Sequence, residues 1–207
     1  MKSYSQAGQD VFVRRILKNK RNGYFLEIGS NDPININNTY ILESEYNWKG
    51  IMVEWNQIFL NLYKEKRPNS IHQIGDAVKT DYLKLLEDNQ FPKNLDYLQI
   101  DLEVNNKSTI DTLINLDKNV MNTYRFATVT FEHDIYTGDF FNTRQLSREI
   151  FEKHGYVRVF SDIGGDNHPF EDWYVHPDLV DMKYVSKVMT SEVLNWPEVL
   201  ERLKNYF

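Results

Sequence analysis

An apolar run that ends in an acid, a glycine and small polar residues constrains the fold of this chain more than any other feature. Residues 24–32 (YFLEIGSND) form this run, and the pattern is typical of a buried strand whose end turns towards a ligand. A second run, residues 50–54 (GIMVE), follows about one β-α-β unit later and also ends in an acid. Sheets that bind nucleotides hold a ribose at this place. The two runs predict that an adenosine-containing cofactor lies across two strand ends.

The rest of the chain alternates short apolar runs with segments of helical periodicity. Further strands are expected at residues 70–74, 95–100, 126–131, 156–162 and 171–175. Helices are expected at residues 5–19 and 38–45, between Asn56 and Pro68, from Thr80, from Ser108, and at 142–155 and 193–207. No helix fits in the loop 164–169 between the last two strands, so these strands should pair antiparallel. The alternation predicts one α/β domain over residues 1–207, with helices on both faces of a mostly parallel sheet and an antiparallel terminal hairpin.

Composition excludes several classes of protein. With 30 acidic residues against 24 Lys and Arg, the formal net charge is -6, so no overall positive field would attract nucleic acid or an anionic membrane. The absence of cysteine removes disulfides, Cys-ligated zinc and thiol nucleophiles. No apolar run approaches the ~20 residues of a membrane span, and the first ten residues lack the apolar core of a signal peptide. We expect a cytoplasmic protein with a small-molecule partner; its oligomeric state stays open.

Acids stand at or just after the ends of four expected strands: Glu27, Glu54, Asp101 and Glu132. Right-handed crossovers between parallel strands bring such ends to one edge of the sheet, where ligands bind. The first turn has a single glycine, Gly29, and lacks the G-x-G-x-x-G spacing that cradles a pyrophosphate. This pattern disfavours a dinucleotide and favours an adenosine without phosphates.

Each expected cofactor contact follows from the chemistry of its residue. Glu54 can accept hydrogen bonds from both ribose hydroxyls, and Ser30 and Asn31 can donate to a carboxylate. Asp76 and Ala77 follow the third strand, where they can touch adenine, and Trp55 follows Glu54 directly. Gln6, in the amide-rich start of the chain with Gln9, either reaches the cofactor or serves in capping and solvation.

Several segments resemble the FkbM-type methyltransferases, a branch of the class I S-adenosylmethionine-dependent enzymes. They are residues 24–32, 38–43 (NTYILE), 48–51 (WKGI), 53–54 and 100–103 (IDLE), with SQ and GQD near the start. The resemblance implies a seven-stranded Rossmann-like sheet, S-adenosylmethionine as methyl donor, and O-methylation, often of a sugar hydroxyl in a small molecule or glycan.

Five positions match residues of that family. Glu27 and Gly29 match its cofactor loop, Glu54 its ribose-binding acid, and Asp101 and Glu103 its acidic pair after the fourth strand. The family usually has glycine after this pair, whereas residues 104–106 here are VNN. The local backbone can therefore differ, and the role of Glu103 stays open.

A hydroxyl is a poor nucleophile until its proton leaves, so methyl transfer needs a base or an equivalent. His133 is the first candidate, because the ordinary pKa of histidine, about 6.5, suits proton acceptance at neutral pH; a plain histidine in a polar loop is the alternative. Asp134 or Asp101 would orient His133 or act in its place. The same three residues with Glu132 also offer ligands for Mg²⁺ or Mn²⁺, which would lower the pKa of the acceptor hydroxyl. The sequence leaves base and metal open.

The expected terminal hairpin offers residues for an acceptor site. His168 and His176 can line such a site, whereas Trp173 and Tyr174 are better explained as core residues than as a sugar-stacking surface. Two other functions stay open: an NAD-dependent nucleotide-sugar oxidoreductase or epimerase, which the missing glycines disfavour, and a non-catalytic Rossmann-like binding module.

Overall fold

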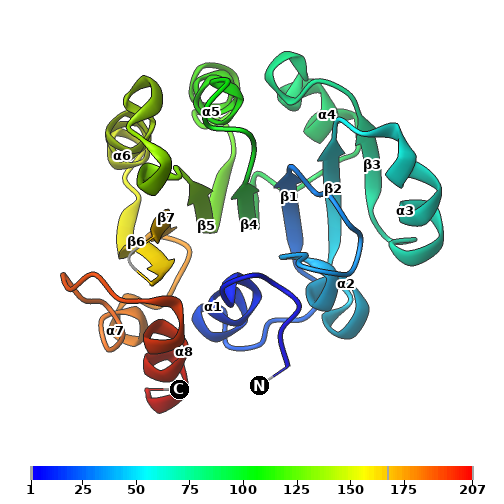
Figure 1. Ribbon diagram of the computed structural model, residues 1–207. Helices are drawn as coiled ribbons and strands as arrows, with labels where there is room; N and C mark the ends of the chain where they lie inside the picture. The colour runs from blue at the N-terminus through cyan, green and yellow to red at the C-terminus, as the bar shows by residue number, and fades with distance from the viewer. Residues whose placement is uncertain (1, 167, 207) are drawn as a thin grey trace.

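The computed structural model describes residues 2–166 and 168–206, which form one seven-stranded sheet in the order β3-β2-β1-β4-β5-β7-β6 (Figure 1). The predicted domain limits, residues 1 and 207, and position 167 of the predicted loop lie outside the described residues. The strands are β1 (Tyr24–Ile28), β2 (Lys49–Glu54), β3 (Ile71–Ile74), β4 (Asn94–Ile100), β5 (Arg125–Glu132), β6 (Val157–Gly165) and β7 (His168–Val175).

The sheet is parallel from β3 to β5 and antiparallel at its other edge. β7 lies between β5 and β6 and pairs antiparallel with both. This arrangement confirms the predicted mostly parallel sheet with a terminal hairpin. The prediction of a loop at 164–169 is wrong in extent, because β6 continues to Gly165 and β7 begins at His168. A Cβ at Gly164 would lie 2.0 Å from the His168 carbonyl oxygen, so glycine permits the close strand approach there.

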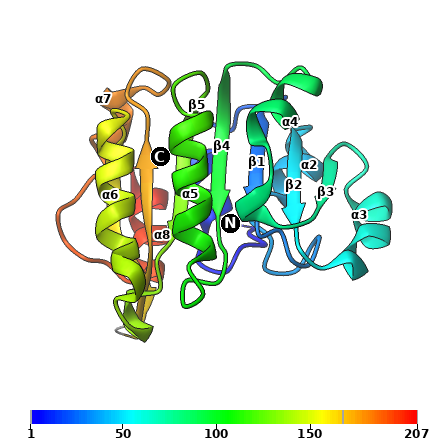
Figure 2. The same cartoon turned by 90° about the horizontal axis from the view of Figure 1, so that it is seen from above.

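Helices cover both faces of the sheet (Figures 1 and 2), as predicted. The α-helices are α1 (Gln9–Ile16), α2 (Tyr40–Tyr46), α3 (Leu60–Lys66), α4 (Tyr82–Asp88), α5 (Ser108–Asn119), α6 (Thr143–Lys153), α7 (Met182–Val185) and α8 (Trp196–Asn205). Helices α4, α5 and α6 lie on one face and α1, α2 and α8 on the other. Each face has its own buried apolar cluster, so the strands between them are buried on both sides, as apolar parallel strands require.

Several helices are shorter than the sequence predicts. The first spans Gln9–Ile16 and not 5–19, because Gly8 precedes it with a left-handed φ of 86° and Lys18 follows it with a φ of 53°. Short 3₁₀ helices join other elements, including η1 (Gln57–Phe59), η2 (Ala77–Lys79), η3 (Ile135–Thr137) and η4 (Phe140–Asn142). The longest α-helix in the described part of the chain, α5, has 12 residues, and no described helix is long and apolar enough to cross a membrane.

Candidate functional site

The turn after β1 is tight because Gly29 lies against the end of β4. Its φ is 84°, and an added Cβ would lie 1.8 Å from the Asp101 carbonyl oxygen. The backbone N–H of Gly29 donates to Val53 O on β2 at 2.9 Å, and that of Asp101 donates to Ile28 O at 3.0 Å. Only glycine satisfies both the left-handed backbone and the close approach. This geometry brings the ends of β1, β2 and β4 together, as the alternation of the sequence predicts.

Glu54, at the end of β2, holds the loop that follows β1. Its Oε2 accepts the Asn31 N–H at 2.9 Å, and its Oε1 accepts the Asn56 N–H at 2.8 Å. The Asn31 carbonyl oxygen in turn accepts the Tyr63 hydroxyl at 2.5 Å. The carboxylate is therefore fixed at the strand end, and each oxygen keeps a lone pair for a further donor.

A buried arginine, Arg67, supports this loop from below. Its side chain is 0% exposed and lies at the end of α3. The guanidinium donates to four oxygens, those of Pro33, Asn37, Thr39 and Glu43, over 2.6 to 3.2 Å. Asn37 then donates to Ser30 O at 3.1 Å, so the network reaches the loop that follows β1. The sequence interpretation missed Arg67, because nothing near it in the chain marks it as buried.

Glu27 lies at the inner side of the same network. Burial raises the pKa of its carboxyl to about 7, and the nearby Arg67 guanidinium limits that rise. Glu27 Oε2 lies 4.0 Å from Arg67 Nη1 and accepts a bond from Asn37 Nδ2 at 3.4 Å.

A cavity of about 810 Å³ opens along the ends of β1, β2, β3 and β4, within the range of cofactor sites. It is lined by every residue predicted to bind the cofactor: Gln6, Glu27, Gly29, Ser30, Asn31, Glu54, Trp55, Asp76 and Ala77. Asp101, Glu103 and Asp134 line it as well, but His133 does not. We call this space the large cavity.

The large cavity has features that fit a cationic ligand with hydrogen-bond donors. No Lys or Arg is among the described residues that line it, whereas seven carboxylate side chains are. Asn38 Oδ1 and Gln99 Oε1, on two lining residues, are buried and have no hydrogen-bond partner among the described residues. A ligand with N–H or O–H groups would remove the cost of these unpaired oxygens. A sulfonium carrying an amine and a ribose has this chemistry.

Three acids crowd the ends of β4 and β5. Burial raises the pKa of Glu132 to about 12, and the neighbouring Asp101 carboxylate raises it further in the same direction. Burial and Asp101 also raise the pKa of Asp134, to about 6. Glu132 therefore holds a proton at neutral pH, whereas Asp134 is mostly ionised and can accept one.

Replacing Glu132 by glutamine is expected to stabilise the protein at high pH. A raised pKa in the folded state means that the stabilisation is complete below the unfolded pKa of about 4.5 and is lost as pH rises towards the folded value of about 12. Glutamine mimics the protonated acid and removes this loss. We expect Glu132→Gln to match the wild type in Tm at pH 4.5 and to exceed it by at least ~2 °C at pH 8.5. Thermal unfolding checks this; Glu149→Gln, an exposed site on α6, should show no such difference.

A second, smaller cavity of about 330 Å³ adjoins the first. Its described lining is Gln6, Glu132, Asp134, Tyr136, Gly165, His168, Phe170 and Trp196. Gln6, Glu132 and Asp134 also line the large cavity, so these three side chains form a shared wall. Gln9, the other amide considered at the start of the chain, is instead buried and donates to Glu171 Oε1 at 2.6 Å.

The hairpin histidines have different positions. His168 begins β7 and lines the small cavity, so it stays a candidate for an acceptor site. The prediction for His176 is wrong, because this residue follows the other end of β7, away from the small cavity. The centroids of its ring and the Tyr156 ring lie 5.1 Å apart. Trp173 and Tyr174 are 0% exposed and lie in the apolar clusters, which confirms their interpretation as core residues.

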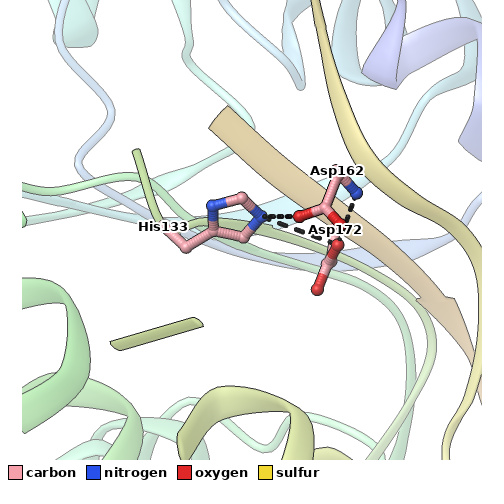
Figure 3. Close-up of side chains that lie close together, drawn as sticks. All are labelled: His133, Asp162 and Asp172. Atoms are coloured by element: carbon pink, nitrogen blue, oxygen red, sulfur yellow. Dashed lines mark hydrogen bonds and ion pairs between the residues drawn. The ribbon is translucent and has the colours of Figure 1, made fainter. Parts of the chain in front are cut away.

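His133 lies behind the shared wall and not in it. Its side chain is buried, and its Nε2 points towards Asp162 Oδ1 at 3.5 Å and Asp172 Oδ1 at 3.6 Å (Figure 3). The Ile135 N–H donates to His133 Nδ1 at 3.3 Å, so this ring nitrogen acts as an acceptor. His133 is not among the described residues that line either cavity, so its ring does not face a ligand there.

The same cluster could hold a metal ion, and of the predicted metal ligands it contains only His133. His133, Asp162 and Asp172 are the described acidic and histidine side chains whose ligand atoms lie within 4.8 Å of one another. Arg148 already forms two bonds with the Asp172 carboxylate, at 2.7 and 2.9 Å, and lies 2.9 Å from Asp162 Oδ1. A cation would have to compete with this arginine, so the cluster is better suited to fixing the hairpin than to holding a metal.

No protein-family model matches the chain, and a comparison with curated proteins finds no significant match. Solved structures do match. A TehB-like SAM-dependent methyltransferase from Corynebacterium glutamicum has a TM-score of 0.51 at 12% identity, over 81% of this chain and 87% of that chain. The SAM-bound amino pentose methyltransferase CalS10 from Micromonospora echinaspora has a TM-score of 0.54 at 10% identity, over 84% of this chain and 92% of that chain.

A methyltransferase from Pyrococcus furiosus is also similar, with a TM-score of 0.50 at 12% identity over 81% of this chain and 82% of that chain. At such identities the likeness concerns the fold. The FkbM branch that the sequence resembles is not matched by a family model. The strand order and these neighbours together show that the chain has the class I methyltransferase fold.

Proposed function

We propose that this protein is an S-adenosylmethionine-dependent O-methyltransferase whose acceptor is a hydroxyl of a small molecule or glycan. One observation carries the proposal: the large and small cavities share a wall of Gln6, Glu132 and Asp134. A donor in the large cavity and an acceptor in the small one would meet at this wall. The acidic lining and the unpaired oxygens of Asn38 and Gln99 support a positively charged donor without phosphates.

S-adenosylmethionine held by Glu54 and the turn after β1 would supply a methyl group on a cationic sulfur, and the sulfur would keep the carbon–sulfur bonding electrons when the acceptor oxygen takes the methyl group. The contribution of the chain is to align the acceptor oxygen and to take its proton. We assign proton removal to Asp134, which lines both cavities and whose pKa, raised to about 6 by burial and by Asp101, suits a base at neutral pH. Asp101 contributes by keeping this pKa above the ordinary value.

We assign His133 a positioning role and not that of the base. It accepts the Ile135 N–H, and its own backbone N–H donates to Phe170 O at 2.7 Å, as does that of Asp134 at 3.0 Å. These bonds hold the turn in which Asp134 adopts a left-handed φ of 47°. His133 therefore fixes the direction of the neighbouring carboxylate.

A divalent cation offers a second way to activate the hydroxyl, with oxygen ligands from Asp101, Glu132 and Asp134. We favour the carboxylate base because Asp101, Glu132 and Asp134 are not among the described side chains whose ligand atoms lie close enough together to share an ion. The oxidoreductase alternative is disfavoured, because among the described lining residues no Lys or Arg faces a pyrophosphate.

Binding of S-adenosylhomocysteine tests the proposal. The wild type should bind it in calorimetry, whereas NAD⁺ should not bind. Glu54→Ala should weaken binding at least ~10-fold, because it removes the acceptor for the ribose hydroxyls and the partner of the Asn31 N–H. Glu149→Ala, an exposed acid remote from the cavity lining, is the matched control. No binding to the wild type would refute the proposal; unchanged binding to Glu54→Ala would refute the role of Glu54.

A further inference from the structure

The small cavity combines aromatic rings with carboxylates. Tyr136, Phe170 and Trp196 line it together with Glu132 and Asp134, and none of its described lining residues is Lys or Arg. Tyr136 and Trp196 are 48% and 37% exposed, so part of each ring can contact a ligand. Aromatic faces bind cations, and they do so most strongly where water is excluded.

The aromatic wall is fixed by contacts between separate elements. A Cβ at Gly165 would lie 3.3 Å from Trp196 Nε1, so the indole ring lies directly over the end of β6. Asn195 forms a bridge with Gly164, which anchors the start of α8 to the hairpin. Across the cavity lining, the Tyr136 ring meets His168 edge-on with centroids 5.2 Å apart. These contacts therefore hold the rings in fixed positions around the small cavity.

No Lys or Arg is among the described residues that line the cavities beside the acids of the shared wall. Glu132 lies opposite Glu171 in the β5–β7 register, and like charges in that position repel. Burial and the Asp101 carboxylate raise the pKa of Glu132, and burial raises that of Glu171 well above its ordinary value. A cationic group in this space would be attracted to the acidic side chains of the shared wall.

We propose that the acceptor is a small cyclic molecule bearing a protonated amine, with the ammonium group beside Glu132 and Asp134 and the ring on Tyr136 and Trp196. The inference rests on the proposed function and names its substrate class. The amine is the binding group, and a hydroxyl of the same molecule is the nucleophile. Phosphorylated and carboxylated acceptors would meet Glu132 and Asp134 at the shared wall.

Glucosamine, glucose, N-acetylglucosamine and glucose 6-phosphate are suitable probes, because they share a ring and differ in charge. Each is titrated into the protein after saturation with S-adenosylhomocysteine, and binding is followed by saturation-transfer NMR and by calorimetry. Glucosamine should bind at least ~10-fold more tightly than the two neutral sugars, and glucose 6-phosphate should bind least.

Two variants separate charge from stacking. Glu132→Gln should reduce the preference for glucosamine over glucose. Trp196→Ala should weaken the binding of both glucosamine and glucose, whereas Trp196→Phe should retain most of the affinity for each. Equal binding of glucosamine and glucose, tighter binding of the phosphate, or no glucosamine binding by a protein that binds S-adenosylhomocysteine would overturn the inference. Absence of S-adenosylhomocysteine binding, seen in the first step, would instead refute the proposed function.

Discussion

Replacement of Arg67 by methionine is expected to lower the free energy of unfolding by about 3–5 kcal/mol. Arg67 is 0% exposed, and its Nε lies 2.7 Å from Glu43 Oε2, so its loss leaves a buried carboxylate without its cation. The acceptors on Asn37 and Thr39 lose their donor at the same time. Urea denaturation measures the change. Because the same network holds the cofactor loop through Asn37, binding of S-adenosylhomocysteine should weaken as well.

An exposed arginine provides the matched control for this prediction. Arg125 forms an ion pair with Asp178 at 3.0 Å, with side chains 41% and 67% exposed. Such pairs contribute little, so Arg125→Met should change stability by less than ~1 kcal/mol. Arg67→Lys keeps the charge but not the planar guanidinium. Its loss of stability should lie between those of Arg67→Met and Arg125→Met. A loss below ~1 kcal/mol in Arg67→Met would show that the buried network does not support the loop.

Replacement of Asp134 by asparagine is expected to lower the rate of methyl transfer by about 10²–10⁴-fold, with binding of S-adenosylhomocysteine unchanged. Asparagine keeps the size of the side chain but cannot take the proton of the substrate hydroxyl. The wild-type rate should fall as pH drops through about 6, because the pKa of Asp134 is raised to about 6 by burial and by Asp101 and only the ionised form is a base. Transfer of a labelled methyl group from S-adenosylmethionine to glucosamine measures the rate.

Asp139→Asn, an exposed site in the same loop, is the control and should retain the wild-type rate and pH profile. The low-pH decline should be absent from the residual activity of Asp134→Asn. A chelator should leave the wild-type rate unchanged if Asp134 is the base. Loss of activity on chelation and its recovery with Mg²⁺ would instead favour a metal-activated hydroxyl.

The arrangement of strands and the place of the large cavity could be predicted because both depend on local patterns. The apolar run before Gly29 and the acid after β2 identify two strand ends, and parallel crossovers bring such ends together. Glu54 and Asp101 accordingly line one cavity. The need for glycine at position 29 has a second cause that the sequence does not show, the Asp101 carbonyl oxygen.

The buried polar networks could not be predicted in this way. Arg67 is 24 residues from Glu43 in the chain, and its neighbours in sequence resemble those of any exposed lysine- and arginine-containing helix end. The orientation of His133 depends on Asp162 and Asp172, which the hairpin brings from 29 and 39 residues away. A histidine after a strand has the same local sequence whether it faces a ligand or a carboxylate cluster, so its role depends on long-range contacts.

The residues of the two cavities come from different parts of the chain. Apart from Glu132 and Asp134, the described lining of the large cavity lies between residues 6 and 108, whereas that of the small cavity, apart from Gln6, lies between 132 and 196. The loops around η3, the hairpin turn and the start of α8 can therefore diverge in evolution without altering the rest of the large cavity. Under the proposed function, exchanging these three segments between related proteins would be a direct route to new acceptor preferences with the same methyl donor.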